Sequence, residues 1–498
     1  MFHVFQLALS TLSIQTICLT FAGVVLGIGV GAIPGLTATM AVAVLTSFTF
    51  GMETKSAIAM LLGIFVGGVY GGSISAILMK IPGTSSAVMT AMDGYPMTAK
   101  GEGAKAIGIA TCASFCGGMV SCLFLIVGCS AIATVAARFT YPEYFVVALF
   151  GLCVIADASG DSLLKGILAA VIGIFITTIG MDNLTGIRRF TLGSNQLMAG
   201  INMVPALIGL FGFSEVLNQL FTISHEKHST GKLGRIFPGW DVLKRVRGIL
   251  FRQSIVGTLV GALPGAGGPI AAFIAYNTEK ARSPNPEEWG TGIPEGVAAP
   301  ECANNATVGG ALIPMLTLGV PGDGVTAIIL GAFTIHGLRC GPMIFQTEPE
   351  VVYTVYLYTI IANLFMLVVG LLAAGWFAKL INTDKSMLIP IILLCCVVGS
   401  YASSNKVFDV YVMVVFGILG FLMEKVGIPA SALILGQVLG NLAETNFRSA
   451  MAMSKGSYAI FFRPIPCVFW ALIVVIVIIP KVRKAILKRR ARRTETPQ

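Results

Sequence analysis

The feature that most constrains the fold of this chain is a set of long segments that contain no Asp, Glu, Lys or Arg. Four such segments are residues 1–52, 106–137, 351–378 and 464–480. About 20 apolar residues are enough for a helix to cross a lipid bilayer. Only 11% of the residues are charged, against about 25% in a soluble domain. This excludes a chain of soluble domains.

The apolar segments indicate helices rather than the strands of a membrane barrel. They are continuous and lack the alternation of apolar and polar residues that barrel strands require. The sequence therefore predicts an all-α polytopic membrane protein with about 10–14 membrane segments, several of them interrupted or re-entrant. The segment Ile14–Val30 is interpreted as a retained first span, because no basic region or small-residue cleavage site accompanies it.

The net charge of +10 is concentrated in residues 222–252 and in the tail after residue 480. Such clusters occur in nucleic-acid-binding proteins, but beside apolar spans they usually mark the cytoplasmic side. We therefore place both segments in the cytoplasm and predict no nucleic-acid partner. The eleven cysteines are scattered and lack neighbours at metal-ligand spacing, so no metal site is firmly assigned and no cofactor is predicted.

The chain contains an internal repeat. GIGVGAIPG at residues 27–35 is echoed by GTLVGALPG at residues 257–265, and GGSISAILMKIPG by GGALIPMLTLGVPG. A weaker third echo pairs PALIGLFGFSE with ALILGQVLGNLAE. Loops at equivalent positions differ in charge, with Lys100 and Lys105 in the first half and Arg339, Glu348 and Glu350 in the second, which favours two repeats of inverted topology.

These patterns divide the chain into four parts. Residues 1–221 form a first transmembrane repeat and residues 222–252 a basic cytoplasmic connecting loop. Residues 253–445 form a second transmembrane repeat, and residues 446–498 a final transmembrane helix with a basic cytoplasmic tail.

Four Pro-Gly pairs interrupt apolar segments at matching positions of the two repeats: residues 34–35, 82–83, 264–265 and 321–322. A Pro-Gly pair breaks the helical ladder and frees polar backbone groups that need a protein or water partner. Paired breaks of this kind indicate the binding site of a transporter, and the N-terminal ends of the half-helices suit an anion. The alternative for the neighbouring glycines is close helix packing.

The predicted site residues lie at or near these breaks. The substrate-binding candidates are Gly35, Thr37, Ser73, Gly83, Thr84, Ser85, Ser86, Gly265, Asn304, Asn305 and Gly322. The coupling-ion candidates are the carboxylates Asp93, Glu301 and Asp323, because an ionisable group in a membrane segment is costly unless it has a function or a partner. Asp93 is equally suited to capping a loop.

The motifs GAIPGLTATMAVAVL, GGVYGGSISAILMKIPGTSSAVMTAMDGYPM, GALPGAGGPIAAFIAYNTEK and EGVAAPECANNATVGGALIPMLTLGVPGDGVTAIILGA extend over most of the chain. With them the chain resembles the large membrane subunit of the bacterial tripartite tricarboxylate transporters. The resemblance implies import of organic carboxylates across the inner membrane, coupled to Na⁺ or H⁺. It also implies two partners, a small four-span membrane subunit and a periplasmic solute-binding protein. Asp323 stands where Ser is frequent in the family.

Two other function classes were weighed against a secondary transporter. An ion channel shares broken helices but requires rings of charges or carbonyls repeated by symmetry. An intramembrane hydrolase requires a nucleophile with its base or paired aspartates, and the motifs G-x-S-x-G and H-E-x-x-H are absent from the sequence. We therefore expect a transporter and no enzyme.

Overall fold

The computed structural model describes residues 12–158, 163–182, 184–221, 236–380 and 385–475. Almost all regular structure in these residues is helical, and the strand pair β1 (Gly180–Met181) and β2 (Arg188–Arg189) is antiparallel. Six helical segments in the described part are long and apolar enough to cross a membrane. They are Ile14–Ala32, Thr54–Met79, Gly103–Ala136, Met203–Phe221, Pro349–Phe377 and Val407–Lys425. The prediction of an all-α polytopic membrane protein is confirmed.

The chain divides into a larger unit, residues 1–137 and 201–426, and a smaller unit, residues 138–200 and 427–498. The larger unit contains α2 (Ile14–Ala32), α3 (Ala38–Leu45), η1 (Thr46–Thr49), α4 (Thr54–Met79), η2 (Ser85–Ala87), α5 (Val88–Ala99), α6 (Gly103–Ala136), α9 (Met203–Leu207), the π-helix η4 (Ile208–Phe213), α10 (Ser214–Phe221), α11 (Trp240–Gly261), α12 (Gly267–Arg282), η5 (Pro286–Glu288), α13 (Pro294–Leu318), α14 (Gly324–Ile335), α15 (Ile344–Thr347), α16 (Pro349–Leu380), α17 (Lys385–Ala402) and α18 (Val407–Lys425). The division by compactness leaves the predicted repeat boundaries untested.

Each of the four Pro-Gly breaks predicted within apolar segments falls between two helices of the larger unit. The pairs separate α2 from α3, α4 from η2 and α5, α11 from α12, and α13 from α14. Gly35 and Gly265 adopt φ angles of 90° and 82°, which side chains with a Cβ rarely adopt. Lys80 and Gly319, the C-caps of α4 and α13, are also left-handed. The breaks thus combine a missing proline N–H with a left-handed turn.

The same close helix contact occurs twice in this unit. A methyl group placed on Gly31 of α2 would lie 2.5 Å from the Gly68 carbonyl oxygen of α4. A methyl group on Gly261 of α11 would lie 2.6 Å from the Thr307 carbonyl oxygen of α13. Because the two contacts join residues at matching positions of the sequence echoes, they support an internal duplication. The inverted orientation of the two halves stays a prediction.

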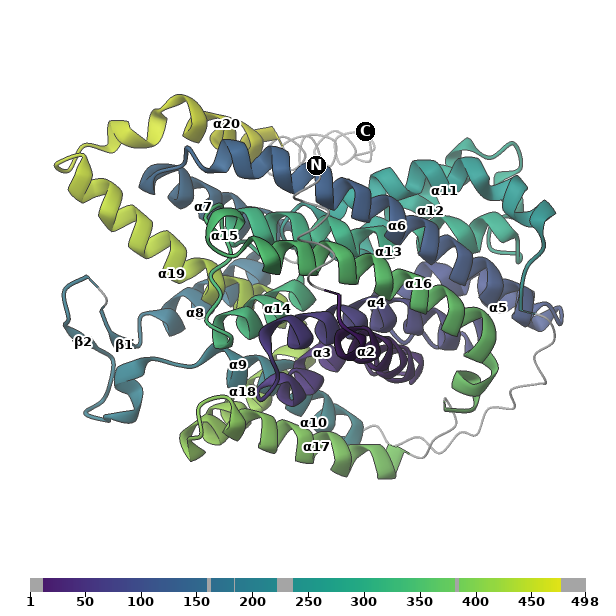
Figure 1. Ribbon diagram of the computed structural model, residues 1–498, viewed down its shortest axis with the longest axis horizontal. Helices are drawn as coiled ribbons and strands as arrows, with labels where there is room; N and C mark the ends of the chain where they lie inside the picture. The colour runs from purple at the N-terminus through teal and green to yellow at the C-terminus, as the bar shows by residue number, and fades with distance from the viewer. Residues whose placement is uncertain (1–11, 159–162, 183, 222–235, 381–384, 476–498) are drawn as a thin grey trace, which may run out of the picture. The chain divides into compact units, whose positions relative to one another are not determined.

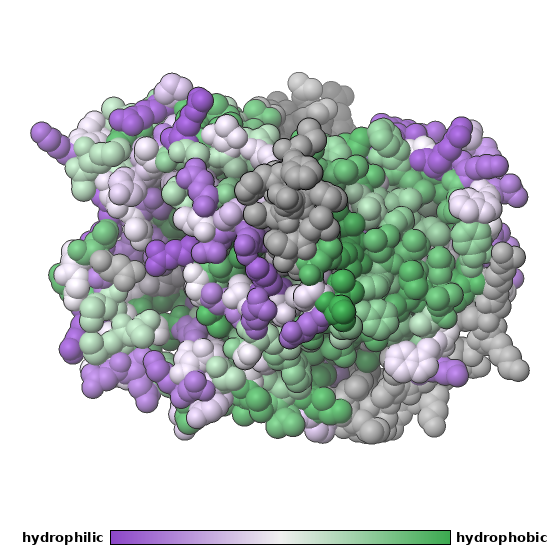
Figure 2. Space-filling model, in the orientation of Figure 1, coloured by the Kyte–Doolittle hydropathy of each residue, from purple (hydrophilic) through white to green (hydrophobic). Residues whose placement is uncertain are grey.

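The helix pair α2 and α4 of the first half is followed by the long helix α6, and the pair α11 and α13 of the second half by α16. Each of these following helices packs on the pair of the other half: α6 packs on α13 and α11, and α16 packs on α4 and α2. Figure 1 shows α4 and α13 enclosed among these neighbours, and α4 is buried along its whole spanning window. Figure 2 shows hydrophobic side chains gathered in the region where Figure 1 places α16 and α2. Leu364, Val368, Leu372 and Trp376 of α16 are exposed, as expected for a face in contact with lipid.

The smaller unit contains α7 (Tyr141–Ala158), α8 (Leu163–Thr177), β1, β2, η3 (Gln196–Ala199), α19 (Ala430–Met453), η6 (Tyr458–Phe462) and α20 (Pro464–Ile473). Helix α19 packs on α7 and α8, and Arg448 of α19 pairs with Asp182 at 2.9 Å and with Glu444 at 3.2 Å. Hydrogen bonds from the Thr185 hydroxyl and the Leu184 N–H, together with Arg448, hold the pKa of Asp182 well below its usual range.

One helix of the larger unit begins earlier than predicted. Residues 240–252, assigned to the connecting loop, belong to α11. Helix α13 begins at Pro294. In α13 the helix starts with Pro at its first position, where the missing N–H costs nothing. Residues 222–235 of the predicted loop and the basic tail after residue 475 lie outside the described residues.

Candidate functional site

The helix starts that follow the four breaks lie side by side in the larger unit. A methyl group placed on Gly324, the first residue of α14, would lie 3.4 Å from Thr39 of α3. A methyl group on Gly268 of α12 would lie 3.3 Å from Cβ of Ser86, in the segment that leads into α5. One on Gly267 would lie 3.6 Å from Cβ of Asp323. Four helix N-termini, each with a partial positive charge, therefore meet in one region.

Backbone hydrogen bonds at the breaks hold these turns together. The Gly265 N–H donates to the Gly322 oxygen at 2.7 Å, which joins the third break to the fourth. The Gly83 N–H donates to the Gly72 oxygen of α4 at 3.3 Å. A methyl group on Gly83 would lie 2.3 Å from the Gly31 oxygen at the end of α2, so the second break also touches the first helix pair.

Asn304 is the amide side chain at this meeting point. It lies on α13 and is 1% exposed. Its Oδ1 atom would lie 2.3 Å from a methyl group on Gly268, so glycine is required at that position for the close approach. Its Nδ2 atom is buried and has no hydrogen-bond partner among the described residues. A buried donor of this kind normally has a partner, and a ligand carboxylate is one that fits.

The hydroxyl groups around the breaks differ in how they are used. Thr37 caps α3 by accepting a hydrogen bond from the Met40 N–H at 3.1 Å. The Thr84 and Ser86 hydroxyls lie 3.1 Å apart, and Ser85 is exposed. Ser73 donates to the Tyr70 oxygen of its own helix at 2.8 Å. Ser73 therefore does not present its hydroxyl hydrogen to the breaks.

Of the eleven predicted substrate residues, most lie at the breaks. Gly35, Thr37, Gly83, Thr84, Ser85, Ser86, Gly265, Asn304 and Gly322 are there, while Ser73 and Asn305 bond elsewhere. Gly35 also faces a group that the sequence analysis missed. A methyl group on it would lie 3.5 Å from Oε1 of Glu215, on α10 directly after the π-helix η4. The weak third echo ends at this glutamate, but its spacing gives no indication of a contact with Gly35.

Asp93 is fully buried, and four donors surround its carboxylate. The N–H groups of Gly290, Gly292 and Ile293 donate to it at 2.8–3.0 Å, and the Tyr276 hydroxyl donates at 2.8 Å. These bonds join α5 and α12 to the loop before α13. The loop-capping alternative describes this geometry well. A role of Asp93 in ion coupling stays a prediction.

Glu301 is also fully buried, but neutral side chains surround it. The Thr90 hydroxyl of α5 donates to Oε1 at 2.5 Å, and the Ser114 hydroxyl of α6 donates to Oε2 at 3.2 Å. Asn305 donates to Oε2 at 3.4 Å and to Ser114 Oγ at 2.7 Å. Asn305 thus belongs to the Glu301 cluster, which we define as Thr90, Ser114, Glu301 and Asn305. Thr90 and Ser114 were missed because they lie far from Glu301 in the sequence.

Asp323 caps the N-terminus of α14. Its Oδ1 atom accepts from the Thr326 N–H at 2.8 Å and from the Thr326 hydroxyl at 2.7 Å. A carboxylate at a helix N-terminus is favourable because it opposes the helix dipole. The structure thus gives Asp323 a local capping role at the place where the breaks meet, and its part in ion coupling is untested.

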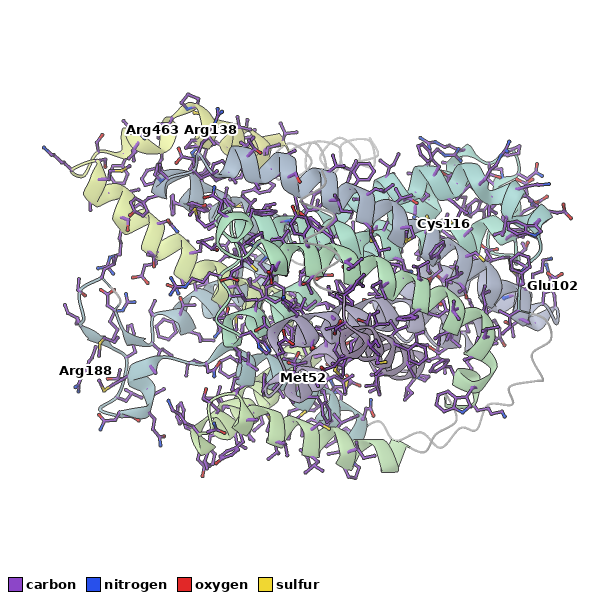
Figure 3. The ribbon with its side chains drawn as sticks, viewed as in Figure 1. Met52, Glu102, Cys116, Arg138, Arg188 and Arg463 are labelled. Atoms are coloured by element: carbon purple, nitrogen blue, oxygen red, sulfur yellow. The ribbon has the colours of Figure 1, made fainter. Side chains whose placement is uncertain are left out.

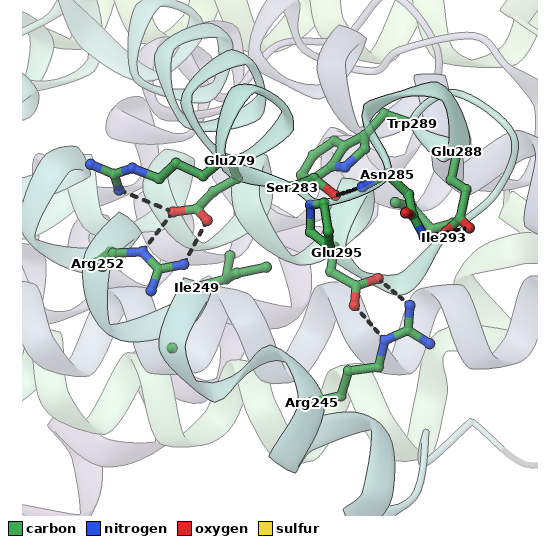
Figure 4. A pocket seen from close by; sticks show the side chains of 13 residues that line it. Arg245, Ile249, Arg252, Glu279, Ser283, Asn285, Glu288, Trp289, Ile293 and Glu295 are labelled. Carbon is green, nitrogen blue, oxygen red and sulfur yellow. Dashed lines mark hydrogen bonds and ion pairs between the residues drawn. The ribbon is translucent and has the colours of Figure 1, made fainter.

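A pocket of about 470 Å³ lies on the larger unit between α11, α12 and the loop before α13. Figure 4 shows the ion pairs in it: Glu279 pairs with Arg252 and Arg282, and Arg245 pairs with Glu295. Trp289 also lines this pocket and packs edge-on against Tyr276 with ring centroids 5.0 Å apart. Because its charged groups pair with each other, this pocket offers less to an anion than the breaks do.

The cysteines of the described residues form no disulfide, and Cys116 lies on α6 (Figure 3). Cys112 of the same helix is buried. No group of three or more His, Cys, Asp or Glu side chains among the described residues is arranged to hold a metal ion.

Comparison with known proteins covers most of the chain. Residues 17–435 match the model of the tripartite tricarboxylate transporter TctA family. An uncharacterized 52.8 kDa protein in the TAR-I ttuC' 3' region of Agrobacterium vitis is 38% identical, with 93% of each chain covered. An uncharacterized protein in the TAR-II ttuC' 3' region of the same organism is 40% identical over 41% of this chain and 85% of that protein. No solved structure matches the chain. The chain therefore belongs to the tripartite tricarboxylate transporter TctA family.

Proposed function

We propose that this chain is the large permease subunit of a secondary active transporter that imports organic carboxylates, of the tricarboxylate or dicarboxylate type, across the bacterial inner membrane. A periplasmic solute-binding protein delivers the substrate, and a small four-span membrane subunit completes the complex. A gradient of Na⁺ or H⁺ drives uptake, with Asp93, Glu301 and Asp323 as the candidate residues for the coupling ion. Membership of the family supports this proposal.

The observation that carries the substrate assignment is the meeting of four helix N-termini, one of which, that of α12, lies against the Asn304 amide. Free N–H groups and the dipole at a helix start favour a negative ligand. The Asn304 Nδ2 group adds a buried donor without a partner among the described residues. A carboxylate oxygen bound there supplies the missing acceptor and gains a charge-assisted hydrogen bond.

Uptake into vesicles tests this proposal. The vesicles contain all three components, labelled citrate and succinate serve as probes, and Na⁺ and pH gradients are applied separately. Saturable, gradient-dependent accumulation is expected for a transporter. Linear flux without saturation would indicate a channel, and no flux of either probe under any gradient would contradict carboxylate transport for this class of substrate.

Asn304→Ala tests the site. We expect the KM for the transported probe to rise about tenfold or more, because one hydrogen bond to a charged group is worth about 1.5–3 kcal/mol. Asn277→Ala is the matched control, since Asn277 is exposed on α12 and donates only to the Phe273 oxygen of its own helix. An unchanged KM for Asn304→Ala would overturn the site assignment.

A further inference from the structure

Glu301 is a buried carboxylate without a positive partner in the structure. It is 0% exposed, and none of the ion pairs among the described residues includes it. Its partners Thr90, Ser114 and Asn305 are all neutral donors. An isolated charge in a low-dielectric interior is costly, so the group must be neutralised for at least part of its working cycle.

The local backbone favours a proton over Na⁺ as the neutralising ion. Sodium sites in transporters typically use carbonyl groups of unwound helix segments. Glu301 instead lies inside α13, which is helical from Pro294 to Leu318. Pro300 leaves the Gly296 carbonyl without its intrahelical donor, but the helix is not unwound there. The hydroxyls of Thr90 and Ser114 donate to its two oxygen atoms and Asn305 donates to one of them, so hydrogens occupy both oxygens of the Glu301 carboxylate in this structure.

The Glu301 cluster also has room for one more hydrogen. Asn305 Oδ1 is a buried acceptor without a hydrogen-bond partner among the described residues. The amide Nδ2 of the same residue already donates to Ser114 Oγ and to the Glu301 backbone oxygen. The polar groups of the cluster therefore include more acceptors than available hydrogens, which is the balance expected around a carboxylate that takes up a proton.

Among the described residues, no cation is hydrogen-bonded or ion-paired to the cluster. The helices that pack against α13, and α13 itself, carry these titratable groups: the Tyr70 hydroxyl of α4, which bonds to Thr111; Asp93 of α5 and Tyr276 of α12, which bond to each other; the thiols of Cys112, Cys116 and Cys302; Asp323 of α14, which caps its own helix; and Glu279 of α12, which pairs with Arg252 of α11 and Arg282 of α12. Of these groups, Asp93 already has four donors of its own.

We infer that Glu301 is the carrier of the coupling proton, an inference that rests on the proposed function. On the periplasmic side the carboxylate takes up a proton and becomes a neutral acid, and on the cytoplasmic side it releases that proton. Glu301 lies about one helical turn before Asn304 on α13. Protonation therefore removes a negative charge next to the substrate carboxylate and favours its binding, which couples the two events.

Glu301→Gln separates this inference from the proposed function. The test uses vesicles with all three components and whichever of labelled citrate and succinate the wild type transports. Exchange of labelled for unlabelled substrate needs no net proton movement, so the variant should retain it, with a rate that depends less on pH than that of the wild type. Accumulation driven by a pH gradient should fall at least tenfold. Glu102→Gln is the control, because Glu102 lies in the turn between α5 and α6 (Figure 3) and pairs with Lys105.

A measurement on the wild type keeps the test independent of how the variant folds. Without Na⁺, addition of substrate outside should drive proton entry, detected by a pH-sensitive dye inside the vesicles. Accumulation that follows a Na⁺ gradient and ignores the pH gradient would overturn the inference while leaving carboxylate transport intact. Full pH-driven accumulation by Glu301→Gln would also overturn it. Absence of substrate exchange in the wild type would instead overturn the proposed function.

Discussion

Two buried carboxylates of the larger unit, Asp93 and Glu301, lie near the contact between α5 and α13 but differ in their surroundings. Asp93 accepts from three backbone N–H groups and a tyrosine hydroxyl. Glu301 accepts from three side chains, two of them hydroxyls that can rotate. Fixed backbone donors strongly favour the charged form, whereas rotatable hydroxyls can serve either form. Burial alone therefore does not identify a carboxylate that carries an ion.

The difference originates in the loop before α13. Gly290 and Gly292 have φ angles of 93° and 102°, which direct successive N–H groups toward Asp93. Residues with a Cβ rarely adopt such angles. No comparable turn lies next to Glu301, because the surrounding part of α13 is helical and the residue before it, Pro300, has no N–H to donate. The first carboxylate thus fastens a loop, and the second remains adjustable.

The largest loss of stability is expected for a substitution in α13 at the point where the Asp93 side chain contacts this helix. A methyl group at Gly296 would lie 2.0 Å from Asp93 Oδ2, and the four donors prevent the carboxylate from moving away. Gly296→Ala should therefore lower the free energy of unfolding by about 3–5 kcal/mol. Denaturant unfolding of the purified protein in detergent measures this.

Gly375→Ala is the matched control for that substitution. Gly375 lies in α16, and nothing lies within 4 Å of a methyl group placed there. Because alanine favours the helical conformation by about 1 kcal/mol over glycine, this variant should be as stable as the wild type or more stable. Equal stability of Gly296→Ala and Gly375→Ala would show that Asp93 is not held in place.

The next largest loss of stability is expected when each of the two carboxylates is replaced by its amide. Asp93→Asn places an amide NH₂ among N–H donors, so we expect a loss of about 2–4 kcal/mol of unfolding free energy. Glu301→Gln should cost less than about 1 kcal/mol, because the hydroxyls of Thr90 and Ser114 can turn to accept from the new amide. Unfolding in detergent at neutral pH measures both. A larger loss for Glu301→Gln than for Asp93→Asn would reverse the assignment of the two roles.

The smallest loss of stability is expected when one hydrogen-bond donor to Asp93 is removed. Tyr276→Phe removes the hydroxyl that donates to Asp93 but retains the ring that packs against Trp289. Since the three backbone N–H donors remain, the expected loss is about 1–2 kcal/mol. Tyr411→Phe is the control, because Tyr411 of α18 is 63% exposed. If Tyr276→Phe matches the effect of Asp93→Asn, the backbone donors contribute little and the comparison with Glu301 weakens.

Local chemistry explains which parts of the fold were predictable. Proline lacks an N–H and glycine permits left-handed angles, so the four breaks could be placed from the sequence alone. The first long spans were predictable for the same kind of reason, since uncharged apolar segments have no other stable state in lipid. The start of α11 was not predictable, because its first two turns carry Asp241, Lys244, Arg245 and Arg247, which are typical of a loop or an exposed helix alike.

Much of the candidate site depended on contacts that no local pattern contains. The sequence pointed to Asn304 and to both buried carboxylates by their residue types and by their place beside the breaks. Thr90 lies 211 residues from Glu301 and Gly292 lies 199 residues from Asp93, so their partnership follows only from how α5 packs against α13 and its preceding loop. Ser73 shows the reverse case, because its own helix takes up the hydroxyl that the sequence assigned to substrate.

The sequence by itself determined that the chain is a helical membrane protein with four interrupted helices in two matching sets. These properties depend on each residue's own chemistry, such as side-chain polarity, a missing N–H or a missing Cβ, and are readable without neighbours. Only the tertiary structure decided which donors reach each buried carboxylate. A hydrogen bond requires two groups to come within about 3 Å, and residues two hundred positions apart meet at that distance only through the packing of whole helices.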